Sequence, residues 1–197
     1  VLDRAVNQLG LHALWFMSGN LRQHGRTKML DDSAFSPFWD HVRDMGIPVY
    51  WFVNPAKPGR DSYLAELAAF GRWARRYPEI PAMFTHGLPL SRFTVDGVVS
   101  IPADAWRALE APNVMLEILF PIAQGAEWEY PYIEARPIIR EYYERLGPDR
   151  LAWGSDMPNV ERHCTYRQSL DYLRRYCDFI PADHMARICG DNIVRLF

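Results

Sequence analysis

The chain has 197 residues, 49% of them hydrophobic and 23% charged, which is typical of a folded globular domain. Its 22 basic and 24 acidic side chains give a net charge of −2, which argues against a nucleic acid partner, because phosphate binding needs a surplus of Lys and Arg. No apolar stretch approaches the ~18 residues that span a bilayer, so we expect no membrane partner. The length predicts one domain over residues 1–197.

The cysteine pattern indicates the redox environment. Cys164, Cys177 and Cys189 are odd in number and far apart, which fits neither a disulfide framework nor a C-x-x-C metal site. We therefore expect reduced thiols in a cytoplasmic protein. A small-molecule substrate is the expected partner, and homo-oligomer formation is compatible with these features.

Short apolar runs recur along the chain, and each predicts a buried strand. Amphipathic segments separate the runs and predict helices, beginning with residues 2–9. Asp31-Asp32-Ser33 is expected to cap a helix that ends near Met45, and Asp61-Ser62 to cap a long one. The predicted strands are 12–17, 48–53, 81–86, 114–120 and 150–156, and the later helices are 102–110, 132–146, 166–177 and 181–189.

This alternation predicts an α/β fold with a parallel sheet, because crossover helices join successive apolar strands. An open doubly wound sheet and part of a (β/α)₈ barrel both fit. The dinucleotide fingerprint and the P-loop motif are absent from the sequence. His86, Glu117 and Asp156 lie at the ends of predicted strands, where barrel enzymes gather their catalytic side chains. We therefore favour a (β/α)₈ TIM barrel, of which about three strands lie outside the sequence.

Two of these residues are candidate catalytic groups. Asp156 directly follows an apolar run, and a carboxylate there suits a general base or a metal ligand. An Asx-turn that caps the loop before Pro158 explains Asp156 equally well. His86 could bind a metal or shuttle protons near pH 7, although a structural histidine bonded to a backbone carbonyl is the more frequent outcome.

Other polar residues near the strand ends are weaker candidates. Glu117 interrupts an apolar run, and we expect it to pair with an arginine rather than to act from the barrel interior. Arg162 and His163 follow Asp156 and could contact a substrate, although surface charges look the same in a sequence. Trp153 could line a pocket for a flat substrate.

A basic loop follows the first predicted strand. His24 lies between Arg22 and Arg26, and such a loop could hold a substrate carboxylate through bidentate contacts. A solvated loop is the more frequent outcome.

Three motifs carry a resemblance to a known family. Residues 151–158 read L-A-W-G-S-D-M-P, residues 188–197 read I-C-G-D-N-I-V-R-L-F, and residues 85–89 read T-H-G-L-P. They resemble the last strand, the closing helix and the sixth strand of the amidohydrolase superfamily, in the branch called amidohydrolase family 2. The resemblance runs over nearly the whole chain.

The resemblance implies a (β/α)₈ barrel whose strands four to eight are the five apolar runs. It also implies hydrolysis of C–N, C–O or C–C bonds, or decarboxylation of aromatic or muconate-type acids. Asp156 takes the place of the aspartate that binds metal or activates water. His86 takes the place of the histidine that binds metal or polarises the substrate carbonyl.

The chain departs from the family at the metal site. A first-strand H-x-H pair has no counterpart in the sequence, and Phe52 stands where the strand-five metal histidine is expected. Phenylalanine has no lone pair for Zn²⁺, and the amide of Asn54 is a poor zinc ligand. Zinc bound by Asp156 and His86 is thus implied by the family but opposed by Phe52. Lactonases that resemble this family work without metal and also lack that histidine.

The sequence therefore predicts a hydrolase of a small cyclic or aromatic carboxylated ester, lactone or amide. Asp156 would be the base that activates water and His86 its electrophilic partner, with Asn54, Trp153, Arg162 and His163 as substrate contacts. One alternative is a metal-dependent decarboxylase of an aromatic or muconate-type acid. The other is an inactive or truncated barrel scaffold.

Overall fold

The computed structural model describes residues 1–19, 28–55, 57–125 and 128–197. Within them, a 5-stranded sheet has the order β1-β2-β3-β6-β7, so its strands follow chain order, and every pair is parallel. The five predicted strands are thereby confirmed. Their bounds are β1 (Leu14–Met17), β2 (Val49–Phe52), β3 (Ala82–Phe84), β6 (Val114–Ile118) and β7 (Leu151–Trp153).

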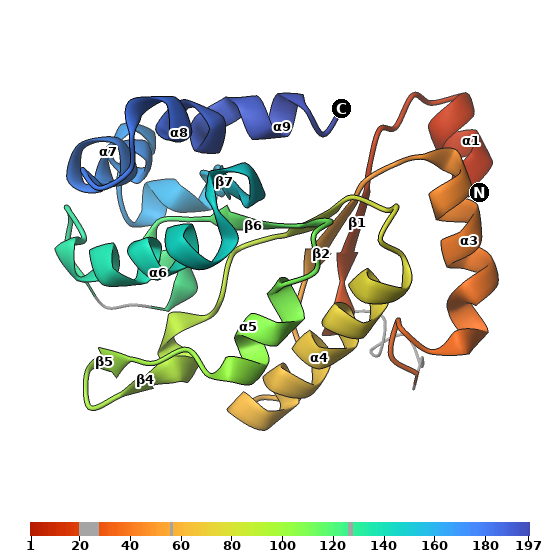
Figure 1. Cartoon of the computed structure of the whole chain (residues 1–197), viewed down its shortest axis with the longest axis horizontal. Helices are drawn as coiled ribbons and strands as arrows, with labels where there is room; N and C mark the ends of the chain where they lie inside the picture. Colours follow the sequence, from red (N-terminus) through yellow and green to blue (C-terminus); the bar gives the residue numbers. More distant parts are fainter. Residues whose placement is uncertain (20–27, 56, 126–127) are drawn as a thin grey trace.

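Helices follow each strand along the outer side of the sheet. In Figure 1, α4 and α5 run side by side near the middle of the molecule, and α6, α7 and α8 gather near β7. No described helix is long and apolar enough to cross a membrane. The helices are α1 (Leu2–Asn7), α3 (Ser36–Met45), α4 (Arg60–Arg76), α5 (Ala103–Leu109), α6 (Arg136–Leu146), α7 (Tyr166–Tyr176), α8 (Ala182–Ala186) and α9 (Asn192–Val194).

The helix starts agree with the predicted caps in one case and differ in another. The Asp32 side chain accepts a hydrogen bond from the backbone N–H of Ala34 at 2.8 Å, at the short turn that leads into α3. The prediction that Asp61-Ser62 caps α4 is wrong. Gly59 is the N-cap. Asp61 lies in the first turn, where its negative charge interacts favourably with the positive end of the helix dipole.

A small hairpin between β3 and α5 was not predicted. It pairs β4 (Thr94–Val95) with β5 (Val98–Val99) in antiparallel fashion. Its turn residues have positive φ, 50° at Asp96 and 78° at Gly97, which is the conformation of a type I′ turn. An Asp-Gly pair between valines is typical of a β-hairpin, so this hairpin could have been predicted from the sequence.

The two faces of the sheet differ in what covers them. On the outer face, Trp51, Phe84, Leu116 and Leu151 form one row across four strands and are buried beneath the helices. On the inner face, the side chains include that of Glu117, which lies one residue beyond that row. Because parallel strands end at one edge, residues that follow β3 and β7 are brought to the same side of the molecule.

Candidate active site

His86 and Asp156 meet at the carboxyl edge of the sheet. His86 follows β3 and Asp156 follows β7, and the sequence separates them widely. His86 Nε2 lies 3.7 Å from Asp156 Oδ1, and their side chains are 32% and 20% exposed. The edge therefore presents an imidazole beside a carboxylate that a ligand can reach.

Both residues have an unusual backbone conformation. The φ angle is 67° at His86 and 53° at Asp156, in the left-handed region that residues other than glycine seldom adopt. Such conformations cost on the order of 1–3 kcal/mol each, and they gather at functional sites. Strain at both members of the pair therefore supports a functional role for this edge.

Glu117, on β6, holds the backbone at His86. Its Oε2 accepts a hydrogen bond from the His86 backbone N–H at 2.6 Å, so its partner is an amide of the candidate site. The expected pairing with an arginine is corrected by this contact. Directly after β7, a Cβ added to Gly154 would lie 2.1 Å from Glu117 Oε1, so the close approach of this carboxylate requires glycine there.

Asp156 also has a neighbour on its own loop. Asn159 Nδ2 donates a hydrogen bond to Asp156 Oδ1 at 3.3 Å, while the backbone carbonyl of Asp156 accepts one from Val160 N–H at 3.2 Å. The Asp156 carboxylate therefore lies beside the side chains of Asn159 and His86. The turn to Val160 is closed by the backbone oxygen of Asp156 and not by its carboxylate.

Burial raises the pKa of the Glu117 carboxyl. The His86 backbone N–H and the His86 ring act in the opposite direction, and Asp156 adds to the increase because two carboxylates repel each other. The net direction is upward, so folding favours the protonated form of Glu117.

This pKa has a consequence for stability. A carboxyl group with a raised pKa in the folded state stabilises the fold below its unfolded pKa and loses that contribution as pH rises through its folded pKa. We therefore expect the free energy of unfolding of Glu117→Gln, relative to that of the wild type, to rise as pH increases from about 4.5 and to level off above the folded pKa of Glu117, measured by urea unfolding at several pH values. The exposed Glu144→Gln serves as the control. A constant difference across this range would contradict the prediction.

Two further predicted residues lie next to His86. The Phe52 ring packs against the imidazole, with 4.3 Å between ring centroids. Asn54 lies two residues later, and it lines with Phe52 and His86 a cavity of about 140 Å³. The structure thus brings His86, Asp156, Phe52 and Asn54 to one region.

Three predicted substrate contacts lie elsewhere. Trp153 points to the outer face, where its Nε1 donates to the Ser169 carbonyl of α7 at 2.8 Å. Arg162 and His163 line a separate surface hollow, and the His163 ring contacts Phe120 with 5.8 Å between centroids. These three residues are not brought together with His86 and Asp156. The basic loop around His24 lies outside the described residues.

The donor set for a metal is incomplete in the part of the chain that the structure describes. There, no group of three or more His, Cys, Asp and Glu side chains is arranged to hold an ion. Asp156 and His86 supply two donors, whereas zinc sites in proteins use at least three protein ligands. The described residues therefore do not fit a zinc site by themselves.

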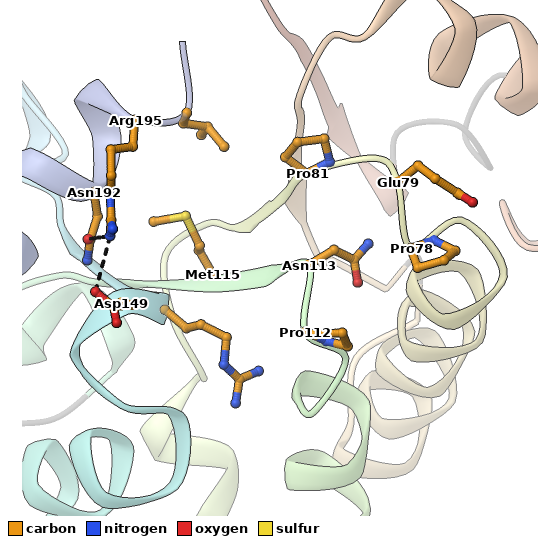
Figure 2. Close-up of a pocket in the computed structure, with 11 residues that line it drawn as sticks. Pro78, Glu79, Pro81, Pro112, Asn113, Met115, Asp149, Asn192 and Arg195 are labelled. Carbon is orange, nitrogen blue, oxygen red and sulfur yellow. Dashed lines mark hydrogen bonds and ion pairs between the residues drawn. The ribbon is translucent and has the colours of Figure 1, made fainter.

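A second cavity lies at the opposite ends of the strands. It has a volume of about 380 Å³, and Figure 2 shows Met115 between Asn113 on one side and Asp149 and Asn192 on the other. Arg195 donates hydrogen bonds to Asp149, at 3.2 Å, and to Asn192, so these polar groups of the cavity wall are bonded to one another. Barrel enzymes act at the carboxyl ends of their strands, which points to the His86 edge instead.

Arg92 and Tyr63 line the cavity beside His86, and neither was predicted from the sequence to lie there. Arg92 lies on the loop that follows β3, so its position after a strand end was the one available signal.

Comparison with known proteins places the chain in a family. The profile of the amidohydrolase family matches residues 2–197. A comparison with curated protein sequences gives no match.

Solved structures share the fold at low sequence identity. An amidohydrolase from Burkholderia multivorans has a TM-score of 0.74 at 15% identity, covering 99% of this chain and 68% of its own. A probable 2-pyrone-4,6-dicarboxylic acid hydrolase from Acinetobacter baumannii, with citric acid bound, has a TM-score of 0.70 at 15% identity, covering 100% and 68%. A dihydroxybenzoic acid decarboxylase from Polaromonas, with bound manganese, has a TM-score of 0.65 at 14% identity, covering 99% and 63%.

The chain thus spans 63–68% of the length of these relatives. Its five parallel strands in chain order, each followed by helical segments, correspond to consecutive units of a (β/α)₈ barrel. The chain belongs to amidohydrolase family 2.

Proposed function

We propose that the chain carries the catalytic edge of a hydrolase that acts on a small cyclic or aromatic carboxylated ester, lactone or amide. The observation that supports this most directly is the His86–Asp156 pair, two strained residues with side chains 3.7 Å apart. The neighbouring hydrolase named for a pyrone dicarboxylic acid adds support for the substrate class.

Asp156 is the base in this proposal. Its carboxylate takes a proton from a water molecule, whose oxygen attacks the carbonyl carbon of the substrate. The C–O or C–N bond then breaks, and Asp156 returns the proton to the leaving oxygen or nitrogen. Asn159 donates to Oδ1 and so holds the carboxylate in one orientation through the cycle.

His86 is the group that stabilises negative charge on the carbonyl oxygen. Its imidazole lies beside the base, so a carbonyl oxygen can rest against the ring while water rests against Asp156. The Phe52 ring covers the imidazole, and Glu117 fixes the backbone that carries it. These two are positioning residues, because they act through His86.

A panel of lactones and esters tests the proposal. We expect the full chain to release acid from a carboxylated lactone such as 2-pyrone-4,6-dicarboxylate, detected with a pH indicator. His86→Gln should lower kcat by about 10²-fold, because one stabilising donor is lost. His41→Gln, at an exposed histidine of α3 that contacts Asp3, is the matched control and should keep the wild-type rate. An unchanged rate in His86→Gln would contradict the role of this residue.

Decarboxylation is the second candidate, favoured by the manganese-bound decarboxylase among the structural neighbours. It predicts release of CO₂ from a hydroxybenzoate and about one divalent ion per chain by elemental analysis, zinc being the family expectation. Hydrolysis of a lactone with no ion retained would favour the first candidate. Failure of both reactions would leave the scaffold alternative.

A cytoplasmic location is also proposed. It is supported by Cys164, Cys177 and Cys189, which are all free thiols in the structure.

A further inference from the structure

Thr85, the residue directly before His86, is bonded twice to one carbonyl group of β2. Its backbone N–H and its hydroxyl both donate hydrogen bonds to the carbonyl oxygen of Trp51, at 2.8 Å and 2.9 Å. The N–H bond extends the parallel pairing of β2 with β3 beyond Phe84, whereas the hydroxyl bond is an additional contact that needs a side-chain donor. Thr85 is 5% exposed, so little water competes for this carbonyl. The end of β3 is therefore held on β2 by a side chain as well as by the backbone.

The carbonyl that Thr85 binds belongs to a closely packed residue. Trp51 is 3% exposed, and its ring centroid lies 4.9 Å from that of Trp73 on α4. The next residue, Phe52, packs its ring on the His86 imidazole. Two adjacent residues of β2 thus contact the backbone before His86 and the His86 ring, and the packing on α4 keeps this part of β2 in place.

The chain turns sharply after Thr85. His86 and Gly87 have φ angles of 67° and 66°, both in the left-handed region. Glycine adopts this conformation freely, but a residue with a Cβ keeps it only where its surroundings hold it. On the β6 side, the Glu117 side chain accepts a hydrogen bond from the His86 N–H. On the β2 side, the hydroxyl of Thr85 holds the residue before the turn, so His86 is fixed from both neighbouring strands.

We propose that Thr85 is a positioning residue, whose hydroxyl holds the end of β3 on β2 and so keeps the His86 imidazole beside Asp156. Thr85 is buried and does not line the cavity beside His86, so it acts through the neighbouring residue and not on the substrate. Reaction rates depend steeply on the placement of a catalytic group, so loss of the hydroxyl should lower kcat and leave KM nearly unchanged. The inference rests on the proposed function and deepens it by naming a residue that fixes the direction of the imidazole.

Two substitutions at position 85 separate the hydroxyl from the volume of the side chain. Thr85→Val keeps the shape and removes the hydroxyl, whereas Thr85→Ser keeps the hydroxyl and removes the methyl group. We expect Thr85→Val to lower kcat on 2-pyrone-4,6-dicarboxylate by about fivefold to tenfold, with KM within about twofold of the wild-type value. Thr85→Ser should keep kcat within about threefold of wild type. If Thr85 only filled space, the order would be reversed, because serine leaves a cavity and valine does not.

Thr94 provides the matched control. Its hydroxyl also donates to a backbone carbonyl, that of Leu90 at 2.8 Å, but in the segment that leads into the β4–β5 hairpin. Thr94→Val should therefore leave kcat unchanged. Thermal melting checks that each variant folds, and Thr85→Val should melt near the wild-type temperature, because the N–H of residue 85 still binds the Trp51 carbonyl.

Hydrogen exchange of the His86 backbone amide gives a readout that needs no turnover. Followed by NMR on the full chain, it reports how often the hydrogen bond from His86 to Glu117 opens. We expect exchange in Thr85→Val to be about twofold to tenfold faster than in wild type. Thr85→Ser and Thr94→Val should exchange at the wild-type rate.

Three outcomes would overturn the positioning role. They are unchanged exchange of the His86 amide in Thr85→Val, faster exchange with an unchanged kcat, and a lower kcat in Thr85→Ser than in Thr85→Val. The failure of the proposed function is distinguishable from these. Faster exchange in Thr85→Val, in a protein that turns over no lactone, would remove the reaction and keep the hold of Thr85 on His86. Turnover with kcat unchanged in Thr85→Val would keep the reaction and remove the role of Thr85.

Discussion

Replacing Asp156 with asparagine is expected to lower kcat on a carboxylated lactone by about 10²–10⁴-fold, because the amide cannot take the proton of the attacking water. The change is small in every other respect. Asparagine has the same shape, and its Oδ1 can still accept the hydrogen bond from Asn159. KM should therefore change little, since binding does not depend on proton transfer in this scheme.

The backbone at Asp156 makes this substitution a clean test. Its φ of 53° lies in the left-handed region, which asparagine tolerates as well as aspartate does. Asp96 has a similar φ of 50° but lies in the β4–β5 turn, so Asp96→Asn is a matched control for the backbone effect. The melting temperatures of both variants should stay near that of the wild type. A rate within about threefold of wild type in Asp156→Asn would remove this residue from the base role.

The sheet could be predicted from the sequence because its strands are short, apolar and separated by amphipathic helices. Parallel strands with helices on their outer side leave little choice of topology. The position of His86 and Asp156 at one edge followed from the same rule, since both lie within three residues of the end of a strand. Their convergence to 3.7 Å is thus a result of topology rather than of any local motif.

The face of the sheet to which each side chain points could not be predicted in the same way. Strands buried on both sides show no polar alternation, so the sequence does not say which residues point inward. Trp153 and Glu117 illustrate this. Ala152, not Trp153, is the register partner of Glu117, so Trp153 points outward to α7 and Glu117 inward to the site. The register between β6 and β7 therefore decides on which face of the sheet each of these two side chains lies.

Contacts between distant segments were also beyond the sequence. Tyr63 belongs to α4 and Arg92 to the loop after β3, and neither carries a motif. Only the packing of that loop against the start of α4 brings them to one cavity. The arginine that the sequence analysis did single out after β7, Arg162, lines a different hollow.

The stability of the edge depends on an aromatic cluster on the outer face of the sheet. Trp73, on α4, is completely buried, and its ring centroid lies 4.9 Å from that of Trp51 on β2 and 5.0 Å from that of Trp39 on α3. The cluster thus joins two helices to the strand that ends at Phe52, which packs on His86. The site edge relies on this packing for its rigidity.

Trp73→Ala is expected to lower the free energy of unfolding by about 3–5 kcal/mol, because it removes the largest kind of side chain from a closed core. Trp73→Phe should cost less, since it keeps a ring and deletes an indole N–H that has no hydrogen-bond partner among the described residues. Trp15, on β1, is 54% exposed, so Trp15→Ala should cost about 1 kcal/mol or less. Urea unfolding of the three variants checks the order. A loss of about 3–5 kcal/mol is a large part of the ~5–15 kcal/mol by which a domain is stable, so the difference should be easy to detect. If Trp73→Ala proves as stable as Trp15→Ala, the contact of α4 with the sheet does not contribute to stability as expected.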